Sequence, residues 1–358
     1  MATIKDIARE CGVSAMTVSA VINNKQGEVS APTRERVLDA MRRMKYRPNA
    51  VARGLVGKHM KAIGIADRLA DPTYWSSPYE SPVLEGIVSA ARRHRWEIIY
   101  FTGHPSAQFK QSLPAYLDGR CDGMIFISHG MSEEEARLIV ETGLPVVLVG
   151  DNQFRLKIST IDVDNLAAAH EAVNHLIELG HRRIAMLQGW GSSGNDARVL
   201  GYRKAHAEAG IDIDERLLIE SRAWEEAGHE YARDILSWPR AERPTAIFCF
   251  NDLLAFGVMR AAREAGIDVP GDLSIVGFDD VDRAALVSPP LTTIHQPLRL
   301  VGERAVDNLI ALIEGSLLPG HREIVEHDLV VRESTSRRME WPIAQPAMCQ
   351  SDSPRIEG

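Results

Sequence analysis

The sequence predicts a small all-α head followed by an α/β body of two doubly wound parallel-sheet lobes. Residues 3–45 have the apolar spacing of three short helices, whereas from residue 62 onward short apolar strands alternate with helical segments. The charge divides at the same place. Residues 1–61 contain 12 Lys and Arg against 5 Asp and Glu, a net charge of +7, which leaves −15 on the rest of a chain whose total is −8. A basic head on an acidic body indicates a module that binds a polyanion, although a solvated basic face has the same charge pattern.

The composition limits the classes of function. The 358 residues are 45% hydrophobic and 25% charged, as in ordinary globular proteins, and they suffice for more than one domain. No apolar run approaches the roughly 18 residues of a membrane helix, and the polar N-terminus lacks a signal-peptide core, so we expect a cytoplasmic protein without membrane contact. The four cysteines lie far apart and form no C-x-x-C pair, so we expect a reduced cytosol and neither a zinc site nor a disulfide framework. The cysteines are Cys11, Cys121, Cys249 and Cys349. We expect no other metal and no cofactor.

The three helices of the head have recognisable start signals. Thr3 can cap the first helix, Gly12 supplies a tight turn, and Ser14 can cap the second helix. Pro32 fits the first turn of the third helix. The residues expected to face inward are Ile4, Ile7 and Ala8 in the first helix, Val18, Val21 and Ile22 in the second, and Val37, Leu38, Met41 and Met44 in the third.

Two short helices joined by a glycine turn and backed by a third have helix-turn-helix geometry. The second helix is narrow enough to enter the major groove of DNA. We expect Ala15, Met16, Thr17 and Ala20 on its exposed side. A generic three-helix module with another task has the same pattern.

The segment "YRPNAVARGLVGKHMKAIGI", residues 46–65, joins head to body. Pro48 ends the third helix and Asn49 can cap the short helix "AVARGL". A helix this short is marginal in water, so we expect it to form only against DNA or a partner subunit. Arg53 and Leu55 suit a wedge in the minor groove, where an apolar side chain opens a base step.

These two motifs together carry a resemblance. "TIKDIARECGVSAMTVSAVINN" followed by "YRPNAVARGL" resembles the lactose/galactose/purine-repressor family of bacterial transcription regulators, and the similarity continues to about residue 335. The resemblance implies a periplasmic-binding-protein-like body, a dimer that binds a palindromic double-stranded operator, and a location at the nucleoid. It implies DNA contacts in the head for Thr3, Ser14, Ala15, Met16, Thr17, Ser19, Ala20 and Asn23, and in the hinge for Asn49, Ala52, Arg53 and Leu55.

The variable base-reading positions are apolar in this chain. Ala15, Met16 and Ala20 offer only methyl and thioether contacts and cannot form bidentate hydrogen bonds with bases. We therefore expect the hinge and DNA deformation to carry more of the specificity.

Seven apolar runs in the body are predicted strands. They are residues 62–66, 97–101, 123–128, 145–150, 183–189, 246–250 and 273–278. Helical patterns lie between them, and the number of strands predicts two lobes. In open parallel sheets, ligands bind beyond the carboxyl ends of the strands.

The stretch "RIAMLQGWGSSGNDARVLGY" poses a choice. Gly189, Gly191 and Gly194 form G-x-G-x-x-G between a strand and a helix, the order of a dinucleotide-binding turn, and Glu220 can serve as the ribose-binding acid. The motif lies in mid-chain, however, and Arg198 stands in the first turn of the next helix, two residues after Asp196. A helix N-terminus with an Arg fork also suits hydroxyls, carboxylate or phosphate, so we expect a ligand-facing loop.

The resemblance extends to effector-binding residues in the body. "GNDARVLGY", "FCFND", "IVGFDD", "TTIHQP", "IDVDN" and "AWEEAGHEYA" resemble family segments that contact effector. With Asp196 and Tyr74 from the residues themselves, the expected effector-binding set is Arg198, Asn251, Asp279, Trp224, Asp164, Gln296, Asp196 and Tyr74.

Structural alternatives exist for several of these residues. Trp224 can be a packed core residue, and Asp279 can cap a helix in "DVDRAAL". Tyr74, Trp75 and Tyr79 can wall the cleft or pack at a dimer interface. Carboxylate, amide and guanidinium groups with an indole face suit a sugar, since polar groups pair with hydroxyls and the ring covers the C–H face.

The expected organisation follows from these segments. The tail lacks apolar heptads, which favours a homodimer over a coiled-coil tetramer. The expected parts are a helix-turn-helix domain (1–47), a hinge helix and linker (48–61), a two-lobed effector-binding and dimerisation domain (62–338) with crossovers near 162, 291 and 322, and a tail (339–358) expected to be disordered.

We therefore expect a ligand-responsive transcription regulator, a repressor, that carries a sugar in its cleft. A purine, another metabolite or a protein coregulator can replace the sugar. An enzyme on the same scaffold needs a nucleophile–base constellation, and the histidines are scattered. A periplasmic sugar-binding protein gives no reason for the basic head.

Overall fold

The computed structural model describes residues 2–22, 27–46, 59–67, 77–101, 109–127, 131–150, 156–189 and 194–338. The predicted hinge helix, the predicted tail and the fourth cysteine, Cys349, lie outside these ranges. Cys11, Cys121 and Cys249 are buried free thiols. None of the described helices is long and apolar enough to cross a membrane.

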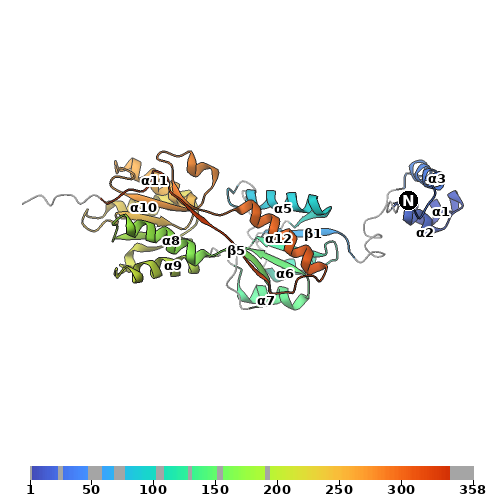
Figure 1. Ribbon diagram of the computed structural model, residues 1–358, viewed down its shortest axis with the longest axis horizontal. Helices are drawn as coiled ribbons and strands as arrows, with labels where there is room; N and C mark the ends of the chain where they lie inside the picture. The colour runs from blue at the N-terminus through green and yellow to red at the C-terminus, as the bar shows by residue number, and fades with distance from the viewer. Residues whose placement is uncertain are drawn as a thin grey trace, which may run out of the picture.

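Three helices form the head (Figure 1): α1 (Ile4–Cys11), α2 (Ala15–Ile22) and α3 (Ala31–Arg43). Their shared core contains Ile7, Val18 and Val37, each fully buried. The prediction that Leu38 faces inward in α3 is wrong, because its side chain is 41% exposed. Ala40, which was not predicted to face inward, is fully buried. At 100° per residue, positions 37, 40, 41 and 44 share one face and position 38 falls at its border.

Lobe 1 is a six-stranded sheet in the order β11-β5-β4-β3-β1-β2, with every pair parallel. Its strands are β1 (Ala62–Asp67), β2 (Glu97–Phe101), β3 (Gly123–Ile127), β4 (Val146–Val149), β5 (Ser159–Val163) and β11 (Arg322–Val325). Its helices are α5 (Glu80–His94), α6 (Phe109–Tyr116), α7 (Glu133–Thr142) and α12 (Leu298–Ile313). Apolar clusters cover both faces of the sheet.

Lobe 2 is a second six-stranded sheet, in the order β12-β10-β9-β8-β6-β7. Its strands are β6 (Ile184–Gly189), β7 (Leu218–Ser221), β8 (Ala246–Cys249), β9 (Ser274–Asp279), β10 (Thr292–His295) and β12 (Asp328–Val330). Its helices are α8 (Asn165–Glu178), α9 (Asn195–Glu208), α10 (Glu225–Ser237) and α11 (Asp252–Glu264), with 3₁₀ turns η2 (Glu215–Leu217) and η3 (Asp282–Ala285). The strands are parallel except β12, which runs antiparallel to β10.

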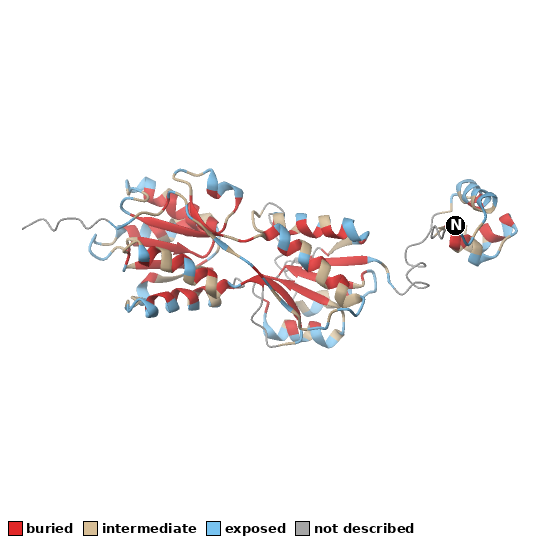
Figure 2. Ribbon diagram, viewed as in Figure 1, coloured by how far each residue is buried: buried red, intermediate tan, exposed pale blue. Residues whose placement is uncertain are grey.

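The chain passes between the lobes at three places, which lie together where the two lobes meet (Figure 1). It crosses from β5 into α8, from β10 into α12, and from β11 into β12. Because β10 leads directly into α12 of lobe 1, its carboxyl end lies at the junction. The carboxyl end of β9 lies beside it, since Gln296, just after β10, donates a hydrogen bond to Asp279 at the end of β9. The inner strands of both lobes are almost entirely buried, with half-buried positions at Gln188 in β6 and His295 in β10 (Figure 2).

All seven predicted strands are present, each within a residue or so of its expected ends, and the class of two parallel-sheet lobes is confirmed. The seven apolar runs do not include β5, β7, β10, β11 and β12. Strands β7, β11 and β12 are short edge strands with exposed positions, and β5 and β10 bury hydroxyl and carboxylate side chains. None of the five has the continuous apolar run that marks a buried parallel strand.

Candidate DNA-binding head and inter-lobe ligand site

The first two helices of the head begin at side-chain caps. Thr3 Oγ1 accepts a hydrogen bond from the Asp6 backbone N–H (3.3 Å), and the Asp6 carboxylate accepts one from the Thr3 backbone N–H (2.9 Å). The side-chain hydrogen bond from Thr3 lowers the pKa of Asp6. Ser14 Oγ accepts from the Thr17 backbone N–H (3.0 Å). Both predicted caps are confirmed, and they fix the start of α2, the helix expected to enter the major groove.

The exposed side of α2 differs from the expectation at one position. Ala15 and Met16 are exposed, Met16 by 80%, and Thr17 and Ser19 are half-buried. Ala20, expected on the exposed side, is only 6% exposed. The remaining expected DNA contacts lie outside the described residues: Asn23, Asn49, Ala52, Arg53 and Leu55.

Arg198 lies at the centre of the polar site in lobe 2. It is the fourth residue of α9, at the carboxyl end of the sheet, and it is 5% exposed. Its Nε donates to Asn165 Oδ1 (2.9 Å) and its Nη1 donates to the Phe250 carbonyl. The guanidinium lies 4.2 Å from the Phe250 ring centroid and 3.5 Å from that of Phe278. Such a buried, stacked guanidinium is held in one orientation.

Carboxylates surround this cation. Burial lowers the pKa of Arg198, and the charges of Asp279 and Asp162 oppose that shift. Asp162 Oδ2 accepts from Asn165 Nδ2 (2.8 Å), so Asn165 bridges the Arg198 guanidinium and the Asp162 carboxylate. Burial, then Asp162 and Asp279, raise the pKa of Tyr79 in lobe 1 well above its ordinary value. The charges of Asp162 and Asp279 therefore act both on Tyr79 of lobe 1 and on Arg198 of lobe 2.

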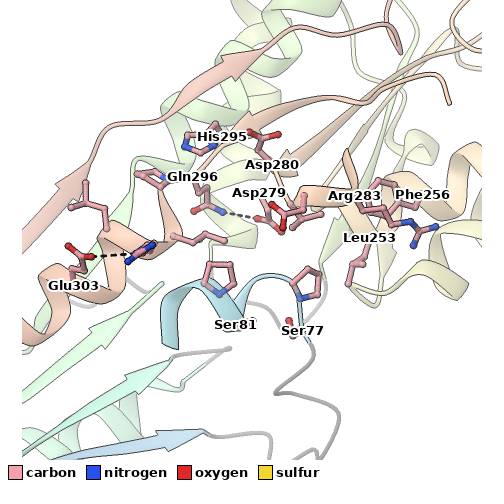
Figure 3. Close-up of a pocket in the computed structure, with 18 residues that line it drawn as sticks. Ser77, Ser81, Leu253, Phe256, Asp279, Asp280, Arg283, His295, Gln296 and Glu303 are labelled. Carbon is pink, nitrogen blue, oxygen red and sulfur yellow. Dashed lines mark hydrogen bonds and ion pairs between the residues drawn. The ribbon is translucent and has the colours of Figure 1, made fainter. Parts of the chain in front are cut away.

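Asp279 and Gln296 meet where the lobes join. Gln296 Nε2 donates to Asp279 Oδ1 (2.7 Å), and both side chains are buried (Figure 3). They line a cavity of about 830 Å³ that also takes in Ser77 and Ser81 of lobe 1 and Phe256 of lobe 2. This volume is within the usual range of small-molecule sites.

Asp279 does not cap a helix. The turn that follows is η3, whose N-cap is Val281, with no side-chain cap. The Val281 backbone N–H donates instead to Asp252 Oδ2 (2.9 Å), and the other oxygen of Asp252 accepts from Thr293 Oγ1 (2.6 Å). Burial raises the pKa of Asp252 well above its ordinary value, and the charge of Asp279 adds to the effect. The capping alternative for Asp279 is therefore wrong.

Two further expected residues hold a loop at this edge. Asn251 caps α11 by accepting from the Leu254 N–H (3.0 Å), and its Nδ2 donates to the Ala223 carbonyl (2.9 Å). That bond fixes the residue before Trp224. The Trp224 side chain is 47% exposed, with the Arg222 guanidinium 5.0 Å from its ring centroid, so the core alternative is wrong.

Asp164 and Asp196 are both exposed. Asp164 caps α8 by accepting from the Ala167 N–H (3.0 Å). Asp196 lies in the first turn of α9, and Tyr74 lies outside the described residues. The structure thus brings Arg198, Asp279 and Gln296 into one buried polar centre and leaves Asp164 and Asp196 at the surface.

The described glycines of the G-x-G-x-x-G stretch make room for this centre. A Cβ on Gly189 would lie 2.4 Å from the Phe250 ring, and a Cβ on Gly194 would lie 2.9 Å from Asn165 Oδ1. Gly194 also has φ 75°, which favours glycine. Both glycines therefore admit the residues that hold Arg198.

Reasoning from the sequence missed the partners of Arg198. Asn165, Asp162, Phe250 and Phe278 come from three separate segments. The available signal was the Asp-rich "IDVDN", from which the neighbouring Asp164 was chosen.

Comparison with known proteins matches both parts of the chain. Residues 3–49 match the model of the bacterial regulatory proteins, lacI family, and residues 173–335 match a periplasmic binding protein-like domain. The HTH-type transcriptional regulator DegA of Bacillus subtilis (strain 168) is 35% identical over 93% of this chain and 98% of its own length. This chain belongs to the lacI family of bacterial regulatory proteins.

Solved structures agree with this membership. The lac repressor dimer bound to operator and the anti-inducer ONPF is 30% identical, with a TM-score of 0.81 over 94% of this chain and 99% of that one. The complex of the transcriptional regulator CelR with cellobiose is 29% identical, with a TM-score of 0.71 over 93% of this chain and 100% of that one. The chain is therefore a DNA-binding transcription regulator and not an enzyme.

Proposed function

We propose that this regulator is a cytoplasmic repressor that binds a palindromic operator as a homodimer and carries a small carbohydrate between its lobes. The lac repressor relative is a dimer on its operator, and the CelR relative holds cellobiose. The positive head, with exposed Ala15 and Met16 on α2, supplies the surface for DNA.

The observation that carries the ligand class is the polar centre of lobe 2. The buried Arg198 guanidinium, the Asp279–Gln296 pair and the half-exposed Trp224 indole lie at or beside the carboxyl edge of the sheet. Charged hydrogen-bonding groups pair with hydroxyls, and an indole face covers the apolar C–H side of a sugar ring. A preformed centre of this kind costs little reorganisation when ligand binds.

The proposed mechanism is linkage between two sites. Ligand between the lobes changes their angle and hence the spacing of the two hinge segments, residues 48–61, in the dimer. The hinge helices form, and Leu55 enters the minor groove, at only one spacing. Ligand then changes operator affinity without touching DNA.

A titration series tests the ligand class. The full chain is screened by thermal shift and calorimetry against mono- and disaccharides, sugar phosphates and nucleobases. We expect a saccharide to bind and Trp224→Ala to weaken it about tenfold or more, since a stacked ring contributes over 1 kcal/mol. Leu318→Ala, which removes an exposed apolar side chain from lobe 1, away from the polar centre of lobe 2, is the control and leaves affinity unchanged. Binding of a nucleobase alone, or full affinity in Trp224→Ala, contradicts the proposal.

A second experiment tests the hinge. Operators are selected from a random duplex library with the full chain, and affinity is measured at several salt concentrations. Leu55→Ala is expected to weaken operator binding and leave ligand binding intact. Affinity falls steeply with salt because binding releases counterions. An unchanged operator affinity in Leu55→Ala excludes the wedge role.

A further inference from the structure

A second cavity lies at the opposite end of lobe 2 from the inter-lobe site. Its volume is about 820 Å³. His181, Thr245 and Leu273, which line it, come just before the parallel strands β6, β8 and β9. Asp279, by contrast, stands at the carboxyl end of β9. The two cavities therefore open at opposite edges of one sheet, and a ligand in one cannot touch a ligand in the other.

Four arginines line this amino-edge cavity, against one carboxylate. They are Arg240, Arg243, Arg337 and Arg338, and the carboxylate is Asp272. Three arginines are exposed, and Arg243 is half-buried. Asp268 lies in the same loop as Asp272 but is not among the residues that line the cavity. Its carboxylate accepts a hydrogen bond from the Gly271 backbone N–H. The cavity thus has a strong positive excess in a protein whose body is strongly negative.

Local structure accounts for two of these arginines. Arg243 Nε donates to the Trp238 carbonyl (2.6 Å) just after α10, where a cation also complements the helix dipole. Arg240 pairs with Asp272 at 3.6 Å. In the part of the chain that the structure describes, the side chains of Arg337 and Arg338 make neither an ion pair nor a hydrogen bond. Among the described residues, the guanidiniums of these two adjacent arginines at the cavity mouth are thus available to a ligand.

The floor of the cavity is uncharged. His181 is 3% exposed, and its ring nitrogens contact Thr245 Oγ1 (2.9 Å) and Ser274 Oγ (3.0 Å). Burial lowers the pKa of His181 to about 4, so the imidazole is neutral at pH 7. Hydroxyl and imidazole groups at the floor with guanidiniums at the rim suit a ligand whose charges lie at its outer end.

We propose that this amino-edge cavity binds a small polyanion bearing phosphate groups, separately from the ligand between the lobes. Guanidiniums form paired hydrogen bonds with phosphate oxygens, and four of them neutralise a compact polyanion. The volume suits a molecule the size of a nucleotide. Bound there, the anion joins the end of α10, the α11–β9 loop and residues 336–338, all of which line the cavity.

Calorimetric titration of the full chain with inorganic pyrophosphate and with a nucleoside triphosphate, at near-physiological salt, tests this proposal. We expect saturable binding, weakened about tenfold or more in Arg337→Gln/Arg338→Gln, since two charge-assisted contacts are lost. The matched control Arg203→Gln/Arg233→Gln removes the same charge from exposed positions of lobe 2 outside the cavity and is expected to change affinity less than about twofold.

Four outcomes would overturn the proposal. The first is no saturable binding by the unmodified protein. The second is equal weakening in both double variants, which indicates a response to net charge alone. The third is unchanged binding in Arg337→Gln/Arg338→Gln, which moves the anion to the basic head. Displacement of pyrophosphate by operator DNA in the unmodified protein also assigns the anion to the head.

Discussion

The three-helix head and lobe 2 keep their polar side chains in different places. In the head, Thr3 and Ser14 are polar groups at helix starts on the surface, and each bonds to a residue three positions away. In lobe 2, Arg198 is buried and its partners Asn165 and Phe250 are 33 and 52 residues distant along the chain.

This difference separates two ways of building a functional surface. The head presents exposed side chains on helices whose starts are fixed locally, so a substitution there changes little beyond its own helix. Lobe 2 holds a buried cation that stabilises several strands at once, so a substitution there affects both the site and the fold.

The largest expected effect is that of Arg198→Ala. It removes the cation facing Asp279 and Asp162 and leaves buried acceptors unpaired, so we expect a loss of about 3–5 kcal/mol in the free energy of unfolding of the body. Urea denaturation of the full chain measures it. Arg203→Ala on the same helix removes an exposed pair with Glu215 and is expected to cost about 1 kcal/mol or less. Equal costs for the two variants contradict the contrast.

Acid is expected to destabilise lobe 2 through His181. Its pKa is about 4 in the folded state, below the ordinary 6.5, so between these values the unfolded chain takes up a proton that the folded one does not. Stability therefore falls as the pH falls through this window, by about 3 kcal/mol in all. Denaturation at several pH values is expected to show a smaller slope in His181→Gln. An identical slope in both proteins excludes this histidine as the source.

Gly189→Ala tests the packing beneath Arg198. The new Cβ meets the Phe250 ring, which the guanidinium holds in place, so overpacking is expected to cost about 2 kcal/mol. Phe250→Leu in the same chain is expected to recover part of that cost, because the smaller side chain makes room. If the losses of stability of Gly189→Ala and Phe250→Leu, measured by thermal unfolding, simply add in the double variant, the Phe250 ring is not what the new Cβ meets.

The smallest expected effect lies in the head. Thr3→Ala removes the capping hydrogen bond to the Asp6 N–H and is expected to cost about 1 kcal/mol, measured by hydrogen exchange of α1 amides in the full chain. Ser30→Ala is the matched control, because Ser30 stands at the N-cap of α3 without a cap hydrogen bond from its side chain. If Ser30→Ala lowers the stability as much as Thr3→Ala does, the hydrogen bond from the Asp6 N–H to Thr3 Oγ1 is not the source of the effect.

The same contrast explains what could be predicted from the sequence. Caps, turns and apolar runs act over a few residues, so the head helices and the seven apolar strands of the body were found, whereas the inner strands β5 and β10, which carry polar side chains, were not. Leu38 and Ala20 were misplaced because a position at the border of a helix face depends on neighbours in space. Arg198, Asp279 and Gln296 were reached through resemblance, but Asn165, Asp162 and the two phenylalanines around Arg198 depend on which strands lie side by side. No local pattern contains that information.

The central claim is that ligand between the lobes and operator at the head are coupled. The most direct test measures operator affinity with and without saturating saccharide, and saccharide affinity with and without operator, on the full chain. The account predicts a change of about fivefold or more, of equal size in both directions, as linkage requires. Unchanged operator affinity while calorimetry shows the saccharide bound would contradict it.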